Sequence, residues 1–299
     1  MNVVAVAVSY QPQLEHLGAL LDALAHQVDS VVVVDNGSEA HFGGWLEKYR
    51  SIHGIFLGSN RGVAAAQNVG IDWARRRGAD YVVLFDQDSL PAPDMVRCLV
   101  EAVQAKQAAG CKVAAVGPRY LDERQDNPPP FIRVQGLKLL RQVCDTSNSI
   151  VEVDYLISSG CLIPTSTLDA VGVMREDLFI DYVDIEWGLR ARHKGFQSLG
   201  VCSAQMQHSL GDIPINFLGK NIPLHSPLRH YYHFRNAVLL YTEPWVPLNW
   251  RLVDGWRLCL KYVFYSLFAT PRKAHWRMMT LGVWHGLVGK AGKFDEGAR

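Results

Sequence analysis

The amino-terminal part of the chain alternates between short apolar runs and longer segments in which apolar residues recur at helical spacing. Residues 3–8 and 31–34 are valine-rich runs without a polar residue, as expected for strands buried on both faces of a parallel sheet. Between them, leucines recur at helical spacing over residues 14–24. These segments together predict a βαβ unit.

The same alternation continues towards the middle of the chain. A helix predicted over residues 63–77 ends at Gly78, and a strand is predicted over residues 81–85 directly after it. The other predicted elements are strands over residues 55–57, 113–116, 155–159 and 197–202 and a helix over residues 178–193. This pattern predicts an α/β fold with a doubly wound, mostly parallel sheet and a ligand site at the carboxyl ends of its strands.

Two segments depart from the alternation. Residues 118–150 are polar and contain consecutive prolines, which predicts an insertion near the rim of the site, within a main domain of residues 1–240. Residues 241–299 combine tryptophans with lysines and arginines around apolar helical stretches, a composition typical of helices that lie on an anionic membrane. One apolar stretch there, residues 258–269, contains Lys261 and is too short to cross a bilayer. Alternatively, these helices pack against the domain or against a second subunit.

The composition limits which partners the chain can bind and which cellular compartment it suits. The chain has 30 lysines and arginines against 29 aspartates and glutamates, so no overall field attracts nucleic acid. No basic residue precedes the apolar run at residues 3–8, which predicts a strand and not a signal peptide. The cysteines form no CxxC pair, which suits free thiols in a reducing cytosol. They are Cys98, Cys111, Cys144, Cys161, Cys202 and Cys259.

Polar residues stand where two of the predicted strands end. Asp35 and Asn36 follow the second valine run, where a carboxylate and an amide can bind a nucleobase or ribose. Residues 59–62 lead into the next helix, where free N–H groups and the cation of Arg61 suit a phosphate. Each segment on its own would also fit an ordinary surface turn.

Asp86 and Asp88 follow directly after the predicted strand over residues 81–85. Two carboxylates at the carboxyl end of a buried strand can hold Mg²⁺ or Mn²⁺ against a diphosphate. The triplet DxD occurs by chance in many proteins, so its position at the strand end carries the prediction. His208, after the last predicted strand, could complete the metal site through a neutral imidazole.

A second acidic cluster lies in the predicted helix over residues 178–193. On a helix, Asp181 and Asp184 would share a face and Glu186 would point elsewhere. One of the first two could be a general base that deprotonates an acceptor hydroxyl. The alternative is a solvated acidic helix start, favoured by the helix dipole.

Taken in chain order, these segments resemble family 2 glycosyltransferases of the GT-A fold, and in particular bacterial rhamnosyltransferases. The resemblance covers roughly residues 2–240, followed by a helical extension. It rests on the strand that ends at Asp35, the loop with Arg61, the pair Asp86 and Asp88, the segment 160–164, the acidic segment with Asp184, and His208.

The resemblance assigns roles to these residues. It implies that Asp35 and Asn36 contact the base and ribose, that Asp86 lies by the nucleotide, and that Asp88 and His208 bind the metal. Residues 160–164 would form the floor of the acceptor side.

The acidic pair of the family aligns with Val183 and Asp184, so its first acid is missing here. Asp184 is therefore the expected base, with Asp181 and Glu186 as alternatives. The stretch from Arg229 to Asn236 resembles the family's arginine and tyrosine motif, in which Arg235 would close over the diphosphate.

The reaction implied by the resemblance is a single displacement with inversion. Asp184 takes the proton of the acceptor hydroxyl while the metal and Arg61 or Arg235 stabilise the departing diphosphate. The implied donor is dTDP-L-rhamnose, and the acceptor is a lipopolysaccharide core or a lipid-linked O-antigen saccharide. The expected location is the cytosolic face of the inner membrane, where the protein would be peripheral, and an oligomer is also compatible with the sequence.

A glycosyltransferase that uses a different nucleotide sugar is an alternative within the same class. Two other functions would fit parts of this pattern. A nucleotidyltransferase also needs a nucleotide domain with acidic metal ligands, but the glycine-rich, basic signature expected near its first strand is absent from this sequence. A sugar-nucleotide-binding scaffold without turnover would keep the site and lack the general base. Replacement of Asp184 separates the scaffold from the enzyme.

Overall fold

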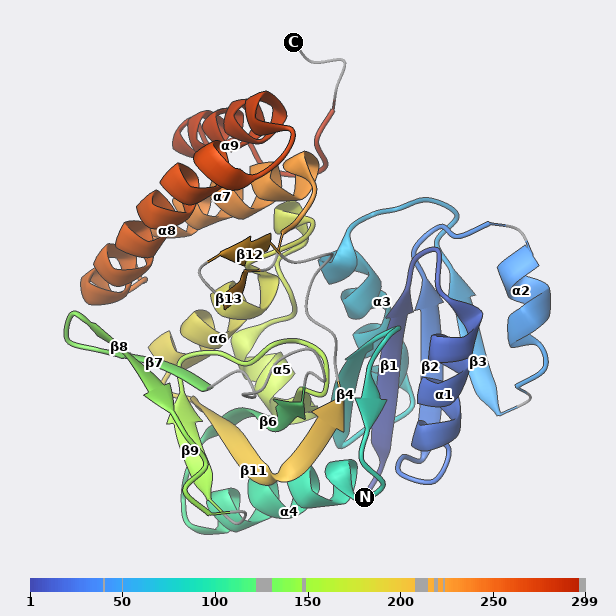
Figure 1. Ribbon diagram of the computed structural model, residues 1–299. Helices are drawn as coiled ribbons and strands as arrows, with labels where there is room; N and C mark the ends of the chain where they lie inside the picture. Colours follow the sequence, from blue (N-terminus) through green and yellow to red (C-terminus); the bar gives the residue numbers. More distant parts are fainter. Residues whose placement is uncertain are drawn as a thin grey trace.

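The computed structural model places most of the chain in one large mixed sheet flanked by helices, with three long helices at one end (Figure 1). It describes residues 1–39, 41–49, 51–121, 131–146, 149–207, 215–217, 220–222 and 224–295. The strand order of the sheet is β3-β2-β1-β4-β10-β6-β11-β5, with β9 paired to β11.

The first half of the sheet is parallel, as the alternating sequence pattern predicts. Its strands are β1 (Val3–Ser9), β2 (Ser30–Asp35), β3 (Ile52–Phe56) and β4 (Tyr81–Asp86). Successive residues of β1 belong to the cores on opposite faces of the sheet, and all of them are buried. Because both faces are covered, β1 and β2 consist almost wholly of valine and alanine.

The second half of the sheet is mixed. Its strands are β5 (Leu90–Pro91), β6 (Val113–Leu121), β9 (Ile150–Val153), β10 (Leu162–Pro164) and β11 (Gln197–Gln207). β6 and β11 are parallel, whereas β10 runs antiparallel to both β4 and β6. The strand predicted over residues 155–159 is wrong, because this segment is irregular. Leu156 is apolar because it fills the core under Gly117, not because it lies in a ladder.

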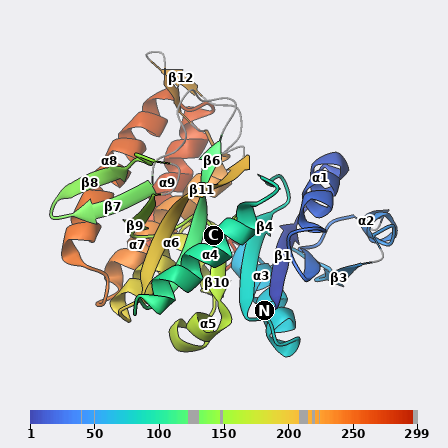
Figure 2. The same ribbon diagram turned by 90° about the horizontal axis from the view of Figure 1, so that it is seen from below.

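Helices cover both faces of the sheet, and Figure 2 shows α1 and α3 on opposite sides of the strands. One face carries α1 (Leu14–Leu24), α2 (His41–Leu46) and α4 (Met95–Ala108). The other carries α3 (Val63–Arg76), α5 (Thr165–Val171) and α6 (Val183–His193). A Cβ at Gly70 in α3 would lie 2.2 Å from a methyl of Val6, so glycine is required for this close approach.

The expected insertion contains a β-hairpin of β7 (Phe131–Gln135) and β8 (Lys138–Gln142). The hairpin packs against β9 and α8. None of its described residues lines the main cleft, and the position of the insertion near the rim stays a prediction.

The expectation that all six cysteines are free is wrong for Cys144 and Cys202, which form a disulfide. The two are 58 residues apart in sequence. The spacing of these cysteines in the sequence therefore does not indicate the disulfide, because it is the fold of the insertion over β11 that brings them together. Cys98, Cys111, Cys161 and Cys259 are free thiols.

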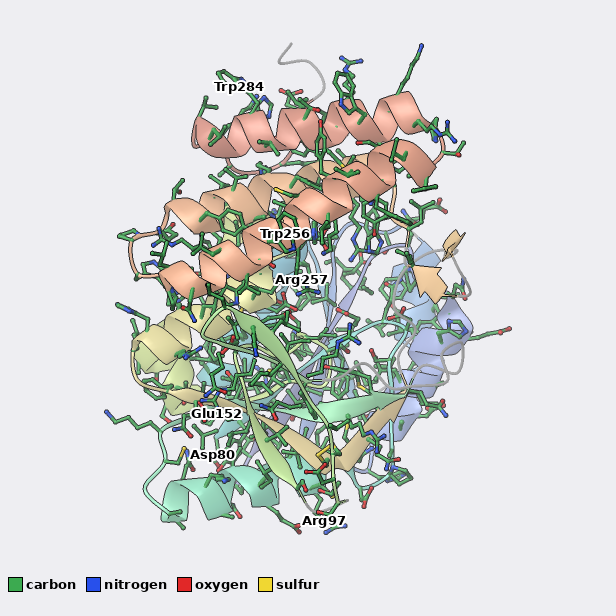
Figure 3. All side chains as sticks on the ribbon, turned by 60° about the vertical axis from the view of Figure 1, so that its left-hand side comes forward. Asp80, Arg97, Glu152, Trp256, Arg257 and Trp284 are labelled. Atoms are coloured by element: carbon green, nitrogen blue, oxygen red, sulfur yellow. A yellow bond between two sulfur atoms is a disulfide. The ribbon has the colours of Figure 1, made fainter. Side chains whose placement is uncertain are left out.

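The carboxyl-terminal part consists of α7 (Pro227–Thr242), α8 (Leu248–Phe268) and α9 (Arg272–Leu287). These helices share a core with Tyr182 and Leu189, and they lie at the end of the molecule opposite α4 (Figures 1 and 3). The boundary expected after residue 240 falls within α7. No helix in the described ranges is both long and apolar enough to span a membrane. The short hairpin of β12 (Ile215–Phe217) and β13 (Lys220–Ile222) precedes α7.

Candidate active site

A cleft of about 770 Å³ opens at the carboxyl ends of the parallel strands. Its walls come from the ends of β1, β2 and β4, from the segment of residues 179–185, and from one face of α7. The charged residues that line it are Asp86, Asp88, Asp181, Asp184 and Arg229. The cleft therefore gathers acidic groups from two distant parts of the sequence.

Asp35 lies beneath the cleft and not on its surface. Its buried carboxylate accepts hydrogen bonds from the backbone N–H groups of Gly37 and Ser38 at 3.2 and 2.9 Å and from the hydroxyls of Ser9 and Ser38. Asp35 thus fixes the turn after β2. That turn presents the next residue, Asn36, to the cleft.

Asn36 joins this turn to the loop after β3. Its side-chain oxygen accepts from the backbone N–H of Arg61 at 2.8 Å, and its amide nitrogen donates to Asn60 at 3.2 Å. The guanidinium of Arg61 is exposed and is not among the groups that line the cleft. Gly62 has a φ of 92°, and a Cβ there would lie 2.6 Å from the carbonyl oxygen of Phe179. The loop after β3 is therefore packed directly against the segment that leads to Asp184.

Asp86 and Asp88 both line the cleft, at the end of β4. The backbone N–H of Asp86 donates to the hydroxyl of Ser159 at 3.0 Å, which also lies 2.6 Å from the hydroxyl of Ser89. Asp88 is the more exposed of the two carboxylates. An exposed carboxylate in an open cleft suits a hard cation that keeps several waters and binds diphosphate oxygens, as Mg²⁺ and Mn²⁺ do.

His208, the second metal ligand that the resemblance implies, lies outside the described residues. Across the ranges that the structure covers, no three histidine, cysteine, aspartate or glutamate side chains gather into a metal site. The chemistry of the donor set at Asp88 fits the expected divalent cation, but the protein ligands in these ranges do not by themselves complete its coordination.

The predicted helix over residues 178–193 begins later than expected. A short 3-10 helix covers Glu176–Leu178, and α6 starts at Val183. Between them, Phe179, Asp181 and Tyr182 have positive φ angles of 61 to 66°. Asp181 therefore precedes the helix, and the prediction that it shares a helical face with Asp184 is wrong.

The irregular segment before α6 is held by two neighbouring buried residues of α7. The amide nitrogen of Asn236 lies within 2.9 Å of the carbonyl oxygens of Leu178, Ile180 and Asp181. The guanidinium of Arg235 is 1% exposed and donates to the carbonyls of Leu178, Asp177 and Gly292. Its Nε donates to Oδ1 of Asn236 at 2.9 Å, so these donors point to the interior and Arg235 does not line the cleft, in contrast to its expected contact with the diphosphate.

The three candidate bases have different surroundings. Asp181 contacts the guanidinium of Arg229 at 3.3 Å. Glu186 is buried, accepts from Arg190 at 2.7 Å and is not among the groups that line the cleft. Asp184 lines the cleft, and its carboxylate accepts from the N–H of Ile185 at 2.9 Å. Asp184 is therefore the acid of this cluster that faces the cleft without a salt bridge to a described residue.

The surroundings of Asp184 raise the pKa of its carboxyl to about 6. Burial is the main cause, and the negative charges of Asp181 and Asp86 add to it. A carboxyl with a pKa near neutrality accepts a proton more readily than an ordinary aspartate and is still largely ionised at neutral pH.

Some residues that shape the cleft carry no obvious sequence motif. Ser159 supports the end of β4, and Phe179 packs over Gly62. The run Ser158-Ser159-Gly160 between two apolar segments is the available sequence signal for the first of these. Nothing in the local sequence marks the second.

Comparison with known proteins defines the class. The family model described as glycosyl transferase family 2 matches residues 6–157, which include the Asn36 turn, the loop after β3 and Asp86 to Asp88. The chain belongs to this family and is a glycosyltransferase, with the GT-A fold that the sequence predicts.

Among curated proteins, the chain is similar to the dTDP-rhamnosyl transferase RfbF of Shigella flexneri. The two are 35% identical over 273 residues, which cover 90% of this chain and 87% of RfbF. It is also 22% identical over 245 residues to the low-salt glycan biosynthesis hexosyltransferase Agl10 of Haloferax volcanii, covering 80% of this chain and 74% of Agl10.

Solved structures share the fold at lower identity. Residues 1–349 of S. aureus TarS in complex with UDP-GlcNAc superpose with a TM-score of 0.61 at 15% identity, covering 96% of this chain and 81% of that one. GalNAc-T7, solved with UDP, GalNAc and Mn²⁺, gives a TM-score of 0.61 at 11% identity. The match covers 96% of this chain and 56% of GalNAc-T7.

Proposed function

We propose that this glycosyltransferase transfers L-rhamnose from dTDP-L-rhamnose to a hydroxyl of a saccharide acceptor, such as a lipopolysaccharide core or a lipid-linked O-antigen, with inversion at the anomeric carbon. The observation that supports dTDP-L-rhamnose as the donor is the 35% identity to a dTDP-rhamnosyl transferase over 90% of the chain. The cleft supports the chemistry, because Asp184 lines the same cleft as Asp86 and Asp88 at the end of β4.

The proposed reaction is one displacement. Asp184 accepts the proton of the acceptor hydroxyl, whose oxygen attacks the anomeric carbon as the bond to the diphosphate oxygen breaks. The bond electrons leave with dTDP. Asn36 and Asp86 hold the nucleotide side of the donor, and Arg229 offers a guanidinium to the diphosphate from the face of α7 that lines the cleft.

Asp88 would hold the divalent cation, with His208 as the further ligand implied by the family resemblance. When bound, the cation supplies positive charge to the departing diphosphate. No second carboxylate nucleophile is needed, because the sugar does not pass through a covalent enzyme intermediate.

The donor and the metal can be tested without an acceptor by measuring thermal stability. Because a ligand that binds only the native state at about 100 times its dissociation constant stabilises it by about 2.7 kcal/mol, dTDP-L-rhamnose with Mg²⁺ or Mn²⁺ is expected to raise the melting temperature clearly. Asp88→Ala should lose the metal-dependent part of this shift. Asp72→Ala, which removes an exposed carboxylate from α3, is the matched control and should keep it.

Either of two results would count against this assignment. Equal stabilisation by UDP-sugars would remove dTDP-L-rhamnose as the preferred donor. An undiminished metal effect in Asp88→Ala would remove the metal role of that residue.

We also propose that the helical end docks on an anionic membrane surface. Exposed apolar side chains recur every three or four residues along α8, and they are Leu248, Leu252, Trp256, Leu260, Val263 and Leu267. Trp256 is 66% exposed there, and Figure 3 shows it on α8 and Trp284 on α9. Residues 248–295 contain eight lysines and arginines against two aspartates and no glutamate, which complements anionic lipid headgroups.

Vesicle cosedimentation tests this docking. The protein is expected to bind vesicles of phosphatidylcholine with phosphatidylglycerol, and Trp256→Glu should weaken binding by about tenfold, because a charge replaces a side chain that would be buried among lipids. Leu137→Glu changes an equally exposed apolar residue in the β7–β8 turn and is the control. The opposite outcome is a protein that does not bind these vesicles and forms a dimer, which Trp256→Glu dissociates. The exposed apolar side chains of α8 would then be the interface with a second copy of the chain.

A further inference from the structure

A second cavity, of about 400 Å³, lies between α7 and α8. Its apolar walls are formed by Ile222, Leu260, Phe264 and Tyr265. Its polar wall is formed by His225, His230, His233 and Lys261. The proposed donor chemistry uses none of these groups.

This cavity adjoins the catalytic cleft. His233, on α7, lines both of them. The ring of His233 lies edge-on to the ring of Tyr182, with 5.1 Å between centroids, and Tyr182 lies two residues before Asp184. His233 therefore lies where the second cavity meets the cleft that Asp184 also lines.

Lys261 gives the cavity a cation. Its ammonium lies 3.0 Å from Nε2 of His233 and can only donate, so Nε2 is the acceptor of this hydrogen bond and the His233 ring carries its proton on Nδ1. No carboxylate in the described ranges lies within 4 Å of the Lys261 ammonium. Two of its three N–H donors thus remain for a ligand, in a site with apolar walls where a charged hydrogen bond is strong.

His230 provides a second, independent observation that points to a ligand in this cavity. This residue is only 2% exposed, and its Nδ1 lies 2.9 Å from Nδ1 of His275 in α9. Its Nε2 is buried and has no hydrogen-bond partner among the described residues. Because a buried polar atom without a partner is unfavourable, the ring edge of His230 that carries Nε2 is suited to a polar group of a ligand in this cavity.

The apolar wall continues onto the surface of the protein. Leu260 belongs to the cavity wall, is 53% exposed, and is also a member of the apolar stripe along α8. Leu260 thus joins the cavity that contains Lys261 to the exposed apolar stripe along α8. An anionic group at the head of an apolar chain matches this combination, whereas a neutral sugar or a free anion matches only part of it.

We propose that this cavity is an acceptor subsite, which holds the phosphate or diphosphate group of an amphiphilic acceptor at Lys261. The apolar chain of the acceptor lies along the α8 stripe, and its saccharide passes His233 to reach Asp184. This inference rests on the proposed glycosyl transfer and adds to it the subsite that binds the headgroup of a lipid-linked acceptor.

Binding of farnesyl diphosphate, a short amphiphile with the expected headgroup, tests the subsite by titration calorimetry. The titration is made with dTDP and Mg²⁺ present, so that the diphosphate site of the donor is already filled. We expect farnesyl diphosphate to bind the wild-type protein more tightly than either inorganic diphosphate or farnesol. Lys261→Met should weaken its binding by about tenfold, or about 1.4 kcal/mol.

Lys290→Met removes an exposed lysine from the same helical end and is the matched control, with expected binding like that of the wild type. The inference is overturned if Lys261→Met binds farnesyl diphosphate unchanged, if inorganic diphosphate binds equally well, or if dTDP displaces the amphiphile. Lys261→Met is expected to fold, because burial lowers the pKa of this lysine and its charge is unfavourable in the folded protein.

The donor experiment on the wild-type protein separates the two proposals. Absence of any stabilisation by nucleotide sugars would count against the glycosyl transfer itself. Donor stabilisation together with unchanged farnesyl diphosphate binding in Lys261→Met would remove only the acceptor subsite.

Discussion

Replacement of Asp184 by asparagine is expected to lower turnover by about 100-fold or more and at the same time to make the protein more stable at neutral pH. The loss of turnover follows because asparagine cannot accept the proton of the acceptor hydroxyl. Its side-chain oxygen can still accept the hydrogen bond from Ile185, so the start of α6 should be undisturbed. Donor binding, measured by the same thermal shift, should be nearly unchanged.

The gain in stability follows from the direction of the pKa shift. The folded protein raises the pKa of Asp184 to about 6, above its value of about 3.9 in an unfolded chain, so the folded state binds this proton more tightly. The associated stability is present below pH 4 and is lost as the pH rises towards and through 6. Above that range the ionised carboxylate disfavours folding by up to about 3 kcal/mol, which Asp184→Asn would remove.

Unfolding followed from pH 4 to pH 8 in metal-free buffer measures this effect. The melting temperatures of the wild type and Asp184→Asn should nearly coincide at pH 4, diverge as the pH rises to about 6, and then keep a constant separation. The wild-type kcat/KM should fall as the pH drops below about 6, where Asp184 becomes protonated. Full turnover in Asp184→Asn would contradict the assignment of Asp184 as the base. A difference in melting temperature that does not change with pH would contradict the raised pKa of Asp184.

Replacement of Arg235 by methionine is expected to destabilise the protein by about 3 kcal/mol or more and to lower turnover, although this residue does not reach the cleft. The change leaves the carbonyls of Asp177, Leu178 and Gly292 without their charged donor. The segment before Asp184 should then lose its fixed geometry, so the base is no longer held in place.

Urea unfolding and steady-state kinetics check this expectation together. Arg277→Met, on the exposed surface of α9, should change the free energy of unfolding by less than about 0.5 kcal/mol. Arg235→Lys should recover only part of the loss, because an ammonium lacks the planar fork of donors that reaches several carbonyls. If Arg235→Met has normal stability but binds the donor more weakly, the result would support direct binding of the diphosphate by Arg235 instead.

The first half of the sheet was predictable because its signal is local. A strand buried on both faces needs an unbroken apolar run, and residues 3–8 and 31–34 have no other role to fill. The cleft-lining carboxylates Asp86 and Asp88 were predictable for the same reason, since they stand where such a run stops.

The segment before α6 was not predictable, because its conformation depends on distant residues. Asp181 and Tyr182 adopt positive φ angles that ordinary side chains disfavour. Asn236 compensates by binding the carbonyls of this segment from more than 50 residues away in sequence. Helical spacing alone therefore predicted a helix that starts too early and placed Asp181 on it.

The role of Arg235 could not be read from the sequence for a related reason. An arginine near a nucleotide site and an arginine that binds backbone carbonyls look alike in a linear pattern. Burial separates them, since the Arg235 side chain is enclosed by α7, the tail and the segment before α6. The disulfide between Cys144 and Cys202 is a similar case, because only the fold brings the two thiols together.

The path of the carboxyl-terminal tail has a practical consequence for handling the protein. After α9, the N–H of Gly292 donates to the carbonyl of Asp177 at 2.6 Å, and the ammonium of Lys293 reaches the carbonyl of Asn60 at 3.3 Å. A tag or surface attachment at this end would pull on both walls of the cleft. Met1, by contrast, lies beside Asp80 at the amino ends of β1 and β4. The amino terminus is therefore the better position for immobilising or labelling the enzyme.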